Sequence, residues 1–349
     1  MSLVQEAFDA TDLVPDLLRE YGDLTRVELC RYLGPREPRR HLYNLVADYP
    51  RRGGRMLRPS LCIATARAFG AEAAAAVRSA AALELLHNAF LVHDDVEDES
   101  DERRGRPTLN ALHGIAIAVN VGDALTLLGL RALLDNRETL GPRLAFAVLE
   151  EAERMARESV EGQAIELGWR SDNALHISDD DYLVMVLKKT CWYTTIFPLH
   201  AGALIGGAHG VDPEQLLRFG FFLGAAFQIQ DDLLNLAGDA TSYGKEIGGD
   251  IWEGKRTLML VHLLRSATAS ERERLSAFLA KSRRERASDD VSWVRQMMDD
   301  YGCLDHARRV AHGLAGAAQH EFEVAFRGVP ASADRSFVRA LCTWVLSRG

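Results

Sequence analysis

The stretch that decides the fold is VRSAAALELLHNAFLVHDD, residues 77–95, which runs directly into VEDESDERRGRPT, residues 96–108. Its apolar residues recur in steps of three and four, as in Ala82, Leu86 and Ala89. This period predicts an amphipathic or fully buried helix. The helix leads into a run of acidic side chains, and the repulsion between them requires a partner that neutralises their charge.

The same helical period occurs along most of the chain, notably at residues 107–134, 143–167 and 214–238. No segment shows the strict alternation that is typical of a strand. Ser178, followed three residues later by Asp181, predicts the start of another helix. The sequence therefore predicts an all-α protein, with an N-terminal helical segment at 1–40 and one large, continuous helical domain at 41–349.

Composition excludes several classes of protein. A formal net charge of −9 argues against a general nucleic-acid binder, which needs a basic face. The five cysteines form no CxxC pair, a pattern that favours reduced thiols in the cytoplasm. No window of about 18 residues is apolar and uncharged, and the N-terminus lacks the basic start of a signal peptide. We therefore expect a cytoplasmic protein without a membrane span.

Two acidic clusters have matching spacing. Asp94 and Asp98 lie four residues apart, hence on one face of a helix, with Asp95 one step round. The segment FQIQDDLLN repeats this layout with Asp231 and Asp232 behind another apolar helix. Either cluster alone is also compatible with a solvated helix end. Two facing clusters predict a site at which Mg²⁺ ions bridge carboxylates and a diphosphate.

Basic residues follow or separate these clusters, and they suit diphosphate binding in a chain that has no Gly-rich phosphate loop. Each one taken singly is also compatible with an ordinary solvated surface charge. The basic candidates are Arg103, Arg104, Arg106, Lys188, Lys189, Lys245, Lys255 and Arg256.

A family resemblance rests on motifs that occur in a fixed order. These are GGRMLRP, LLHNAFLVHDDVEDES, RRGRPT, GDAL, EGQ, KT, FQIQDDLLN, YGKEIGGDIWEGKRT and YGCLDHA. In this order the chain resembles the trans-isoprenyl diphosphate synthases, or polyprenyl synthetases, of the short-chain farnesyl and geranylgeranyl type, over about residues 40–320. The resemblance implies a homodimeric all-α fold of about a dozen helices around a deep central cavity, with 41–349 as the catalytic domain.

The resemblance also implies an activity, a Mg²⁺-dependent condensation of isopentenyl diphosphate with an allylic diphosphate. It implies three Mg²⁺ ions, or Mn²⁺ in their place, but no nucleic-acid partner. The implied metal ligands are Asp94, Asp98 and Asp231, supported by Asp95, Asp232 and Asn235. The implied substrate-binding residues are Arg55, Arg58, His87, Arg103, Arg104, Lys189, Lys245 and Lys255. The implied catalytic residues are Lys189, Thr190, Gln228 and Lys255, where Thr190 and Gln228 offer oxygen dipoles near a carbocation.

Three departures from the family pattern concern binding and product length. Met56 replaces a basic residue of the family's GGKRLRP, and Asn235 replaces the last acid of the second motif. The aromatic residues Trp192 and Tyr193 follow the KT pair, where they line the cavity or pack in the core. Phe90, four residues before Asp94, is the expected wall against a longer chain, with Ala89 and Leu86 beside or below it. We expect a product of C15 to C20 and favour C20 because of Asn235.

Two rival interpretations remain. A class I terpene cyclase shares the acidic metal site but needs no isopentenyl pocket, so Arg58 and His87 argue against it. A non-catalytic partner subunit of a synthase is expected to lack one acidic cluster, whereas both are present here.

Overall fold

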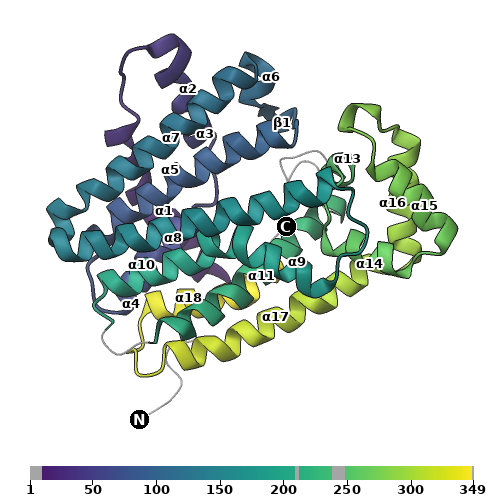
Figure 1. The fold of residues 1–349 in the computed structure, drawn as a ribbon. Helices are drawn as coiled ribbons and strands as arrows, with labels where there is room; N and C mark the ends of the chain where they lie inside the picture. Colours follow the sequence, from purple (N-terminus) through teal and green to yellow (C-terminus); the bar gives the residue numbers. More distant parts are fainter. Residues whose placement is uncertain (1–9, 209–211, 238–247, 348–349) are drawn as a thin grey trace.

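The computed structural model describes residues 10–208, 212–237 and 248–347, and these are almost entirely helical (Figure 1). The predicted all-α class is therefore confirmed. The first half contains α1 (Ala10–Tyr32), η1 (Arg39–Tyr43), α2 (Asn44–Val46), α3 (Asp48–Arg51), α4 (Leu57–Ala68), α5 (Ala73–Glu97), β1 (Glu102–Arg103), β2 (Arg106–Pro107), α6 (Leu109–His113), α7 (Ile115–Asp135) and α8 (Arg137–Ser171). The second half contains α9 (Asp179–Val186), η2 (Leu187–Ile196), α10 (Phe197–Ile205), α11 (Pro213–Ala237), α13 (Gly249–Glu253), α14 (Leu258–Ser266), α15 (Ala269–Leu279), η3 (Arg283–Glu285), α16 (Ser288–Asp300), α17 (Cys303–Ala325) and α18 (Ala333–Ser347).

The long helices pack in pairs around a shared apolar core. Helix α5 lies along α7, α11 lies along α17, and α4 packs against both α5 and α10 (Figure 1). The π-helix η2 contacts α8 on one side and α11 on another. The four elements α5, α8, η2 and α11 therefore surround the middle of the molecule, where the acidic clusters of α5 and α11 meet.

Two glycines let η2 approach its neighbours closely. A Cβ atom at Gly162 of α8 would lie 2.1 Å from the backbone nitrogen of Lys189. A Cβ atom at Gly224 of α11 would lie 2.6 Å from Oγ1 of Thr195. Any larger side chain at either position would push η2 outward, so these glycines fix where the residues of η2 enter the cavity.

The local sequence signals predicted some helix boundaries correctly and others wrongly. The helix start at Ser178 is confirmed, because Ser178 and Asp181 form a capping box at the start of α9. The apolar window at 107–134 is not one helix, because Gly114 adopts a φ of 83° that ends α6 and starts α7. Residues 102–107 also form a two-stranded antiparallel pair that the pattern did not predict.

Helix α1 shares the core of the rest of the chain. Val14 and Tyr21 belong to the same buried cluster as residues of α5 and α18, and α1 packs against α4, α5 and α18. The boundary predicted at residue 40 falls inside the short π-helix η1. It stays a prediction.

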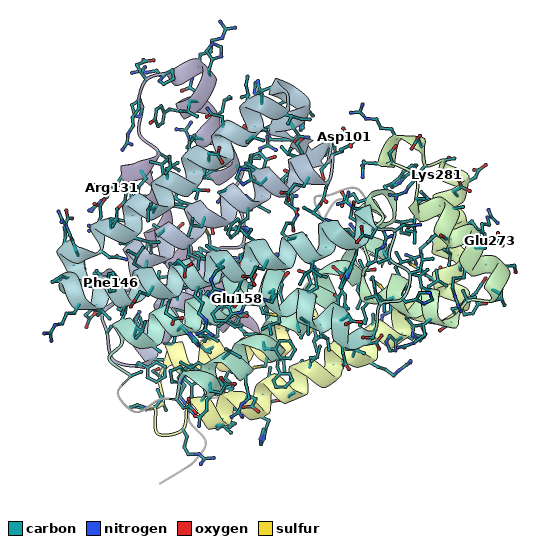
Figure 2. All side chains as sticks on the ribbon, viewed as in Figure 1. Asp101, Arg131, Phe146, Glu158, Glu273 and Lys281 are labelled. Carbon is teal, nitrogen blue, oxygen red and sulfur yellow. The ribbon has the colours of Figure 1, made fainter. Side chains whose placement is uncertain are left out.

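Two helices of the described chain, α5 and α7, are long and apolar enough to cross a membrane by length and composition alone. Helix α5 is a core helix, since 72% of its apolar window is buried, whereas the corresponding share for α7 is 44%. Exposed apolar side chains of α7 and α8, such as Phe146, contrast with charged surface residues such as Arg131 and Glu273 (Figure 2). Long buried helices of soluble proteins meet the same criterion, so this observation is weak evidence for a span.

Candidate active site

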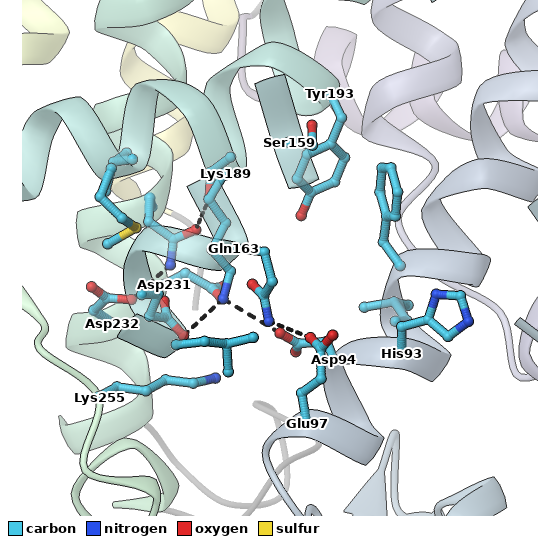
Figure 3. Close-up of a pocket in the computed structure, with 18 of the residues that line it drawn as sticks. His93, Asp94, Glu97, Ser159, Gln163, Lys189, Tyr193, Asp231, Asp232 and Lys255 are labelled. Carbon is cyan, nitrogen blue, oxygen red and sulfur yellow. Dashed lines mark hydrogen bonds and ion pairs between the residues drawn. The ribbon is translucent and has the colours of Figure 1, made fainter. Parts of the chain in front are cut away.

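A cavity of about 530 Å³ lies between α5, α8, η2 and α11. Asp94 of α5 faces Asp231 and Asp232 of α11 across it, and Lys189 and Lys255 reach into the space between them (Figure 3). Most of the site residues predicted from the sequence line this one cavity. They are Arg58, His87, Phe90, Asp94, Arg103, Arg104, Lys189, Thr190, Gln228, Asp231, Asp232 and Lys255.

The remaining predicted residues lie elsewhere. Those outside the cavity lining are Arg55, Leu86, Ala89, Asp95, Asp98 and Asn235. Arg55 lies over the ring of Trp344, at 5.8 Å from its centroid. Leu86 and Ala89 are buried in the core, so Phe90 is the member of the predicted chain-length set that reaches the cavity. Lys245 lies outside the described residues.

The first acidic cluster is held by cations at the C-terminal end of α5, where the helix dipole disfavours negative charge. Lys189 Nζ lies 3.4 Å from Oδ1 of Asp94, and Arg103 Nη2 lies 3.4 Å from its Oδ2. The Nε–H of Arg103 is shared between both oxygens of Asp95, its Nη2 donates to Oδ1, and the Tyr49 hydroxyl donates to Oδ2 of the same carboxylate. Asp95 is fully buried among these donors, and the role predicted for it beside the metal ligands stays a prediction.

Asp98 is engaged by two cations at once. Arg170 Nη1 lies 2.5 Å from its Oδ1, and Lys255 Nζ lies 2.6 Å from its Oδ2. Only 1% of the Asp98 side chain is exposed, so neither oxygen faces the cavity as Asp94 does. Lys255 also pairs with Glu253 at 3.0 Å.

Both cavity lysines remain charged. Burial lowers the pKa of Lys189, but the carboxylates of Glu166 and Asp94 outweigh burial and raise it above its ordinary value. The pKa of Lys255 is raised well above its ordinary value in the same way, chiefly by Asp98 and Glu253. The cavity therefore presents two positive charges near its acidic mouth.

The second acidic cluster has neutral partners. Thr190 donates a hydrogen bond to Oε1 of Gln228 at 2.9 Å, and Gln228 donates to Oδ1 of Asp232 at 2.7 Å. The Tyr182 hydroxyl donates to Oδ2 of Asp232 at 2.9 Å. Burial raises the pKa of Asp232 to about 7, because these neutral donors and Lys255 offset its desolvation only in part.

Asn235 does not reach the cavity. Its side-chain oxygen accepts a hydrogen bond at 3.1 Å from the backbone nitrogen of Asp250, at the start of α13. It is nearly fully buried. In this position Asn235 holds the segment that carries Lys255 against the end of α11.

The donor set fits hard divalent cations of the Mg²⁺ type. Asp94, Glu97, Asp231, Asp232 and Asp250 all turn toward one cavity. In the part of the chain that the structure describes, no three His, Cys or acidic side chains gather closely enough to hold an ion by themselves. Mg²⁺ commonly binds through one or two carboxylates, water and substrate phosphate. These residues therefore fit an ion that is completed by a diphosphate substrate.

A basic pocket adjoins the acidic mouth on the α5 side. Arg58 Nη1 lies 3.5 Å from Nε2 of His87, and Arg104 lines the same wall. Burial, together with the charges of Arg58 and Arg104, holds the pKa of His87 well below its ordinary value. Arg58 Nε and His87 Nδ1 are buried without a hydrogen-bond partner. Polar groups left in this way indicate a pocket whose anionic partner is a ligand.

Two aromatic rings, those of Phe90 and Tyr193, line the cavity next to each other. The Phe90 ring meets the Tyr193 ring edge-on, with centroids 5.6 Å apart. Tyr193 also stacks on His87 at 5.8 Å, and Arg58 lies 4.6 Å from its ring centroid. The two aromatic residues after the KT pair therefore have different positions: Tyr193 lines the cavity, whereas Trp192 is buried in the core.

Several partners in the site escaped the sequence analysis. They are Tyr49, Glu84, Glu166, Arg170 and Tyr182. Each forms a contact or an electrostatic interaction with a predicted residue from a distant part of the chain. No local spacing in the sequence therefore indicated it. The EGQ motif does precede Glu166 by one helical turn, which is the one signal that pointed to this part of α8.

Family comparison agrees with this geometry. A family model described as polyprenyl synthetase matches residues 39–298. The chain therefore belongs to the polyprenyl synthetase family, the trans-isoprenyl diphosphate synthases, and is a prenyltransferase. The resemblance inferred from the motifs is confirmed.

Relatives in this family differ in product. The chain is 31% identical over 311 residues to a short chain isoprenyl diphosphate synthase of Methanothermobacter thermautotrophicus, covering 89% of this chain and 92% of that one. It is also 32% identical over 268 residues to the octaprenyl diphosphate synthase of Escherichia coli, covering 76% and 78%. The relatives therefore agree on a prenyl diphosphate synthase but not on chain length.

Solved structures share the fold. A geranylgeranyl pyrophosphate synthetase from Pyrococcus horikoshii matches with a TM-score of 0.84 and 28% identity, covering 98% of this chain and 100% of that one. A polyprenyl synthase from Caulobacter crescentus, in complex with calcium and isoprenyl diphosphate, matches with a TM-score of 0.84 and 29% identity, covering 97% of each. Both agree with the predicted isoprenoid synthase fold.

Proposed function

We propose that the protein condenses isopentenyl diphosphate with an allylic diphosphate in a head-to-tail, Mg²⁺-dependent reaction that releases diphosphate. The observation that carries the proposal is that Asp94 faces Asp231 across one cavity, with Lys189 and Lys255 between them and the basic pocket of Arg58 and His87 beside them. This arrangement offers separate anion sites for two diphosphates next to one apolar space.

The acidic mouth is the proposed site of the allylic diphosphate. Asp94 and Asp231 are the proposed ligands on the two walls, with Asp98 joining them once it leaves its ion pairs. Bound there, Mg²⁺ or Mn²⁺, three ions in our proposal, would neutralise the diphosphate and favour its departure. Lys189 and Lys255 add positive charge at the same place, where it stabilises the leaving group without reorganisation.

The allylic carbocation that forms needs polar oxygens near it and no free water. Thr190 and Gln228 supply the oxygens from η2 and α11, and their mutual hydrogen bond fixes their orientation. Phe90 and Tyr193 supply aromatic faces on the opposite side. The isopentenyl double bond then attacks the cation, a proton is lost, and the released diphosphate is the proposed acceptor.

Isopentenyl diphosphate is proposed to bind in the basic pocket of Arg58, His87 and Arg104. Arg58 Nε is a buried donor without a partner, His87 Nδ1 is a buried nitrogen without one, and a diphosphate would accept hydrogen bonds from Arg58 Nε and from the Nδ1–H tautomer of His87. Arg55 is exposed, outside the cavity lining, so its proposed contact requires a movement toward the pocket.

The first experiment supplies Mg²⁺, isopentenyl diphosphate and one primer at a time: dimethylallyl, geranyl or farnesyl diphosphate. We expect a longer prenyl diphosphate from at least one primer, measured by product sizing. Absence of condensation with all three primers contradicts the proposed synthase. Release of a cyclic hydrocarbon from a primer alone supports a terpene cyclase instead.

We propose a product of C15 to C20, with C20 favoured. The support is the pair of rings at Phe90 and Tyr193, which line the cavity from α5 and η2 and contact each other. Phe90→Ala should lengthen the product by at least one five-carbon unit, and Leu91→Ala, in the same wall, is the matched control. An unchanged product length in Phe90→Ala would assign this ring to core packing, and a wild-type product beyond C25 would contradict the proposed stop.

We also propose a cytoplasmic homodimer. The support is an apolar surface on α7 and α8, where Ile115 and Leu127 are 62% and 65% exposed and Phe146 is 59% exposed (Figure 2). A second copy of the same face would remove these side chains from water. Leu127→Lys should shift the mass in light scattering to a monomer, and a wild-type monomer would contradict the proposal.

A further inference from the structure

The two candidate metal ligands of the first cluster differ in their access to the cavity. The Asp94 side chain is 20% exposed and lines the cavity, whereas the Asp98 side chain is 1% exposed and does not. Each oxygen of Asp98 has its own cation, Arg170 on Oδ1 and Lys255 on Oδ2. A metal ion can therefore use Asp98 only after at least one of these pairs opens.

The two cations on Asp98 are not equivalent. Lys255 lines the cavity and also pairs with Glu253, so it keeps one carboxylate partner if a bound diphosphate takes the place of Asp98. Arg170 comes from the last turn of α8 and is not part of the cavity lining. Its Nη1 donates a charge-assisted hydrogen bond to Asp98 at 2.5 Å, the strong class of such bonds. Arg170 is therefore the cation that remains on Asp98 when Lys255 moves.

We propose that Arg170 is an internal counter-ion that competes with the divalent cation for Asp98 and so sets the metal concentration at which the site fills. The inference rests on the proposed metal role of Asp98. Without metal, Arg170 neutralises a carboxylate that would otherwise lie at the unfavourable end of the α5 dipole. With metal, the same ion pair has to be broken or shared, which weakens binding.

The test measures Mn²⁺ binding to the full-length protein, with inorganic diphosphate present at one fixed concentration to complete the site, from the electron paramagnetic resonance signal of free Mn²⁺. Arg170→Met removes the competing charge and should lower the Kd for Mn²⁺ about tenfold, the scale of one charge-assisted hydrogen bond. The matched control is Arg157→Met on the same helix. Arg157 is half exposed and pairs with Glu153 and Glu161. The control substitution therefore removes the same charge at a position outside the site.

Arg170→Gln is the second variant, which keeps a polar side chain in case the apolar replacement does not fold. An unchanged Kd in the folded Arg170 variants overturns the proposal, as does an equal gain in Arg157→Met. In an Asp98→Asn background Arg170→Met should give no gain. A gain that persists there would come from a general change of charge, and it would also overturn the proposal.

The binding measurement separates this inference from the proposed function. Suppose that the wild-type protein forms no prenyl product while Arg170→Met binds Mn²⁺ more tightly. This result would contradict the proposed synthase reaction and leave the counter-ion role intact. The reverse result, condensation with an unchanged Kd in Arg170→Met, would leave the reaction intact and remove the role of Arg170.

Discussion

The two walls of the cavity neutralise similar acidic clusters by different means. On the α5 wall, Asp94 and Asp95 are held by the charged groups of Lys189 and Arg103. On the α11 wall, Asp232 is held by the neutral donors Tyr182 and Gln228. Burial therefore raises the pKa of Asp232 to about 7, whereas the cations of the α5 wall hold their charge.

Because of this difference, the same spacing of acidic residues has different consequences on the two walls. On the α5 wall the carboxylates are part of ion pairs, so losing one leaves a buried positive charge. On the α11 wall a carboxylate can be replaced by a neutral group with little change in charge balance. The α11 wall, with its neutral donors, can therefore accept added positive charge. The α5 wall, with its ion pairs, depends on keeping both partners of each pair.

The largest expected effect is on activity. Asp94→Asn removes the carboxylate that both lines the cavity and contacts Lys189. We expect kcat to fall about a thousandfold, the scale of one electrostatic contact to a developing charge. Incorporation of labelled isopentenyl diphosphate measures the loss. Asp101→Asn is the control, because Asp101 is an exposed acid seven residues further on (Figure 2).

A variant Asp94→Asn that keeps more than a tenth of the wild-type kcat would contradict the ligand role of Asp94. Equal losses in Asp94→Asn and Asp101→Asn would mean that net charge at this end of α5 matters and that the position of Asp94 does not.

The next effect is on stability, and it compares the walls directly. Asp95→Asn leaves the buried guanidinium of Arg103 without its main partner, so we expect the free energy of unfolding to fall by about 3–5 kcal/mol. Asp232→Asn keeps a hydrogen-bonding group between Tyr182 and Gln228 and should cost about 1 kcal/mol. Urea unfolding of metal-free protein measures both. Equal losses would contradict the distinction between the two walls.

The sequence predicted the types of residue that surround the cavity better than it predicted which individual residues line it. Asp94 and Asp231 line the cavity as the spacing on two helices predicted. Asp98, at the i+4 position from Asp94, is buried and does not line the cavity. It is the C-cap of α5, and its partners Arg170 and Lys255 come from distant parts of the chain. Helical spacing fixes a face but carries no information about which distant cation claims a side chain at the end of that face.

The same limit explains the aromatic pair after the KT motif. Trp192 and Tyr193 are adjacent, and the sequence left open which of them lines the cavity. They lie in the π-helix η2, where the widened turn changes the direction of successive side chains from that of an α-helix. Periodicity at 3.6 residues therefore could not assign them, whereas the packing of η2 against Gly162 and Gly224 does.

The smallest expected effect concerns pH on the α5 wall, where cations gather around His87. Its pKa is lower in the folded protein than in the unfolded chain, since burial and Arg58 disfavour its protonated form. The stability that neutral His87 contributes is therefore complete above about pH 6.5 and is lost as the pH falls below that value. Wild-type protein should lose up to about 1.4 kcal/mol per pH unit from this group.

His87→Gln should remove that loss, so the difference in unfolding free energy between pH 7.5 and 5.5 should shrink relative to wild type by roughly 1 kcal/mol or more. Urea unfolding at both pH values measures it, with His113→Gln, an exposed histidine of α6, as the control. If both variants keep the wild-type slope, His87 is not buried as a neutral base. The α5 wall would then lack the excess of positive charge that distinguishes it from the α11 wall and that an isopentenyl diphosphate would neutralise.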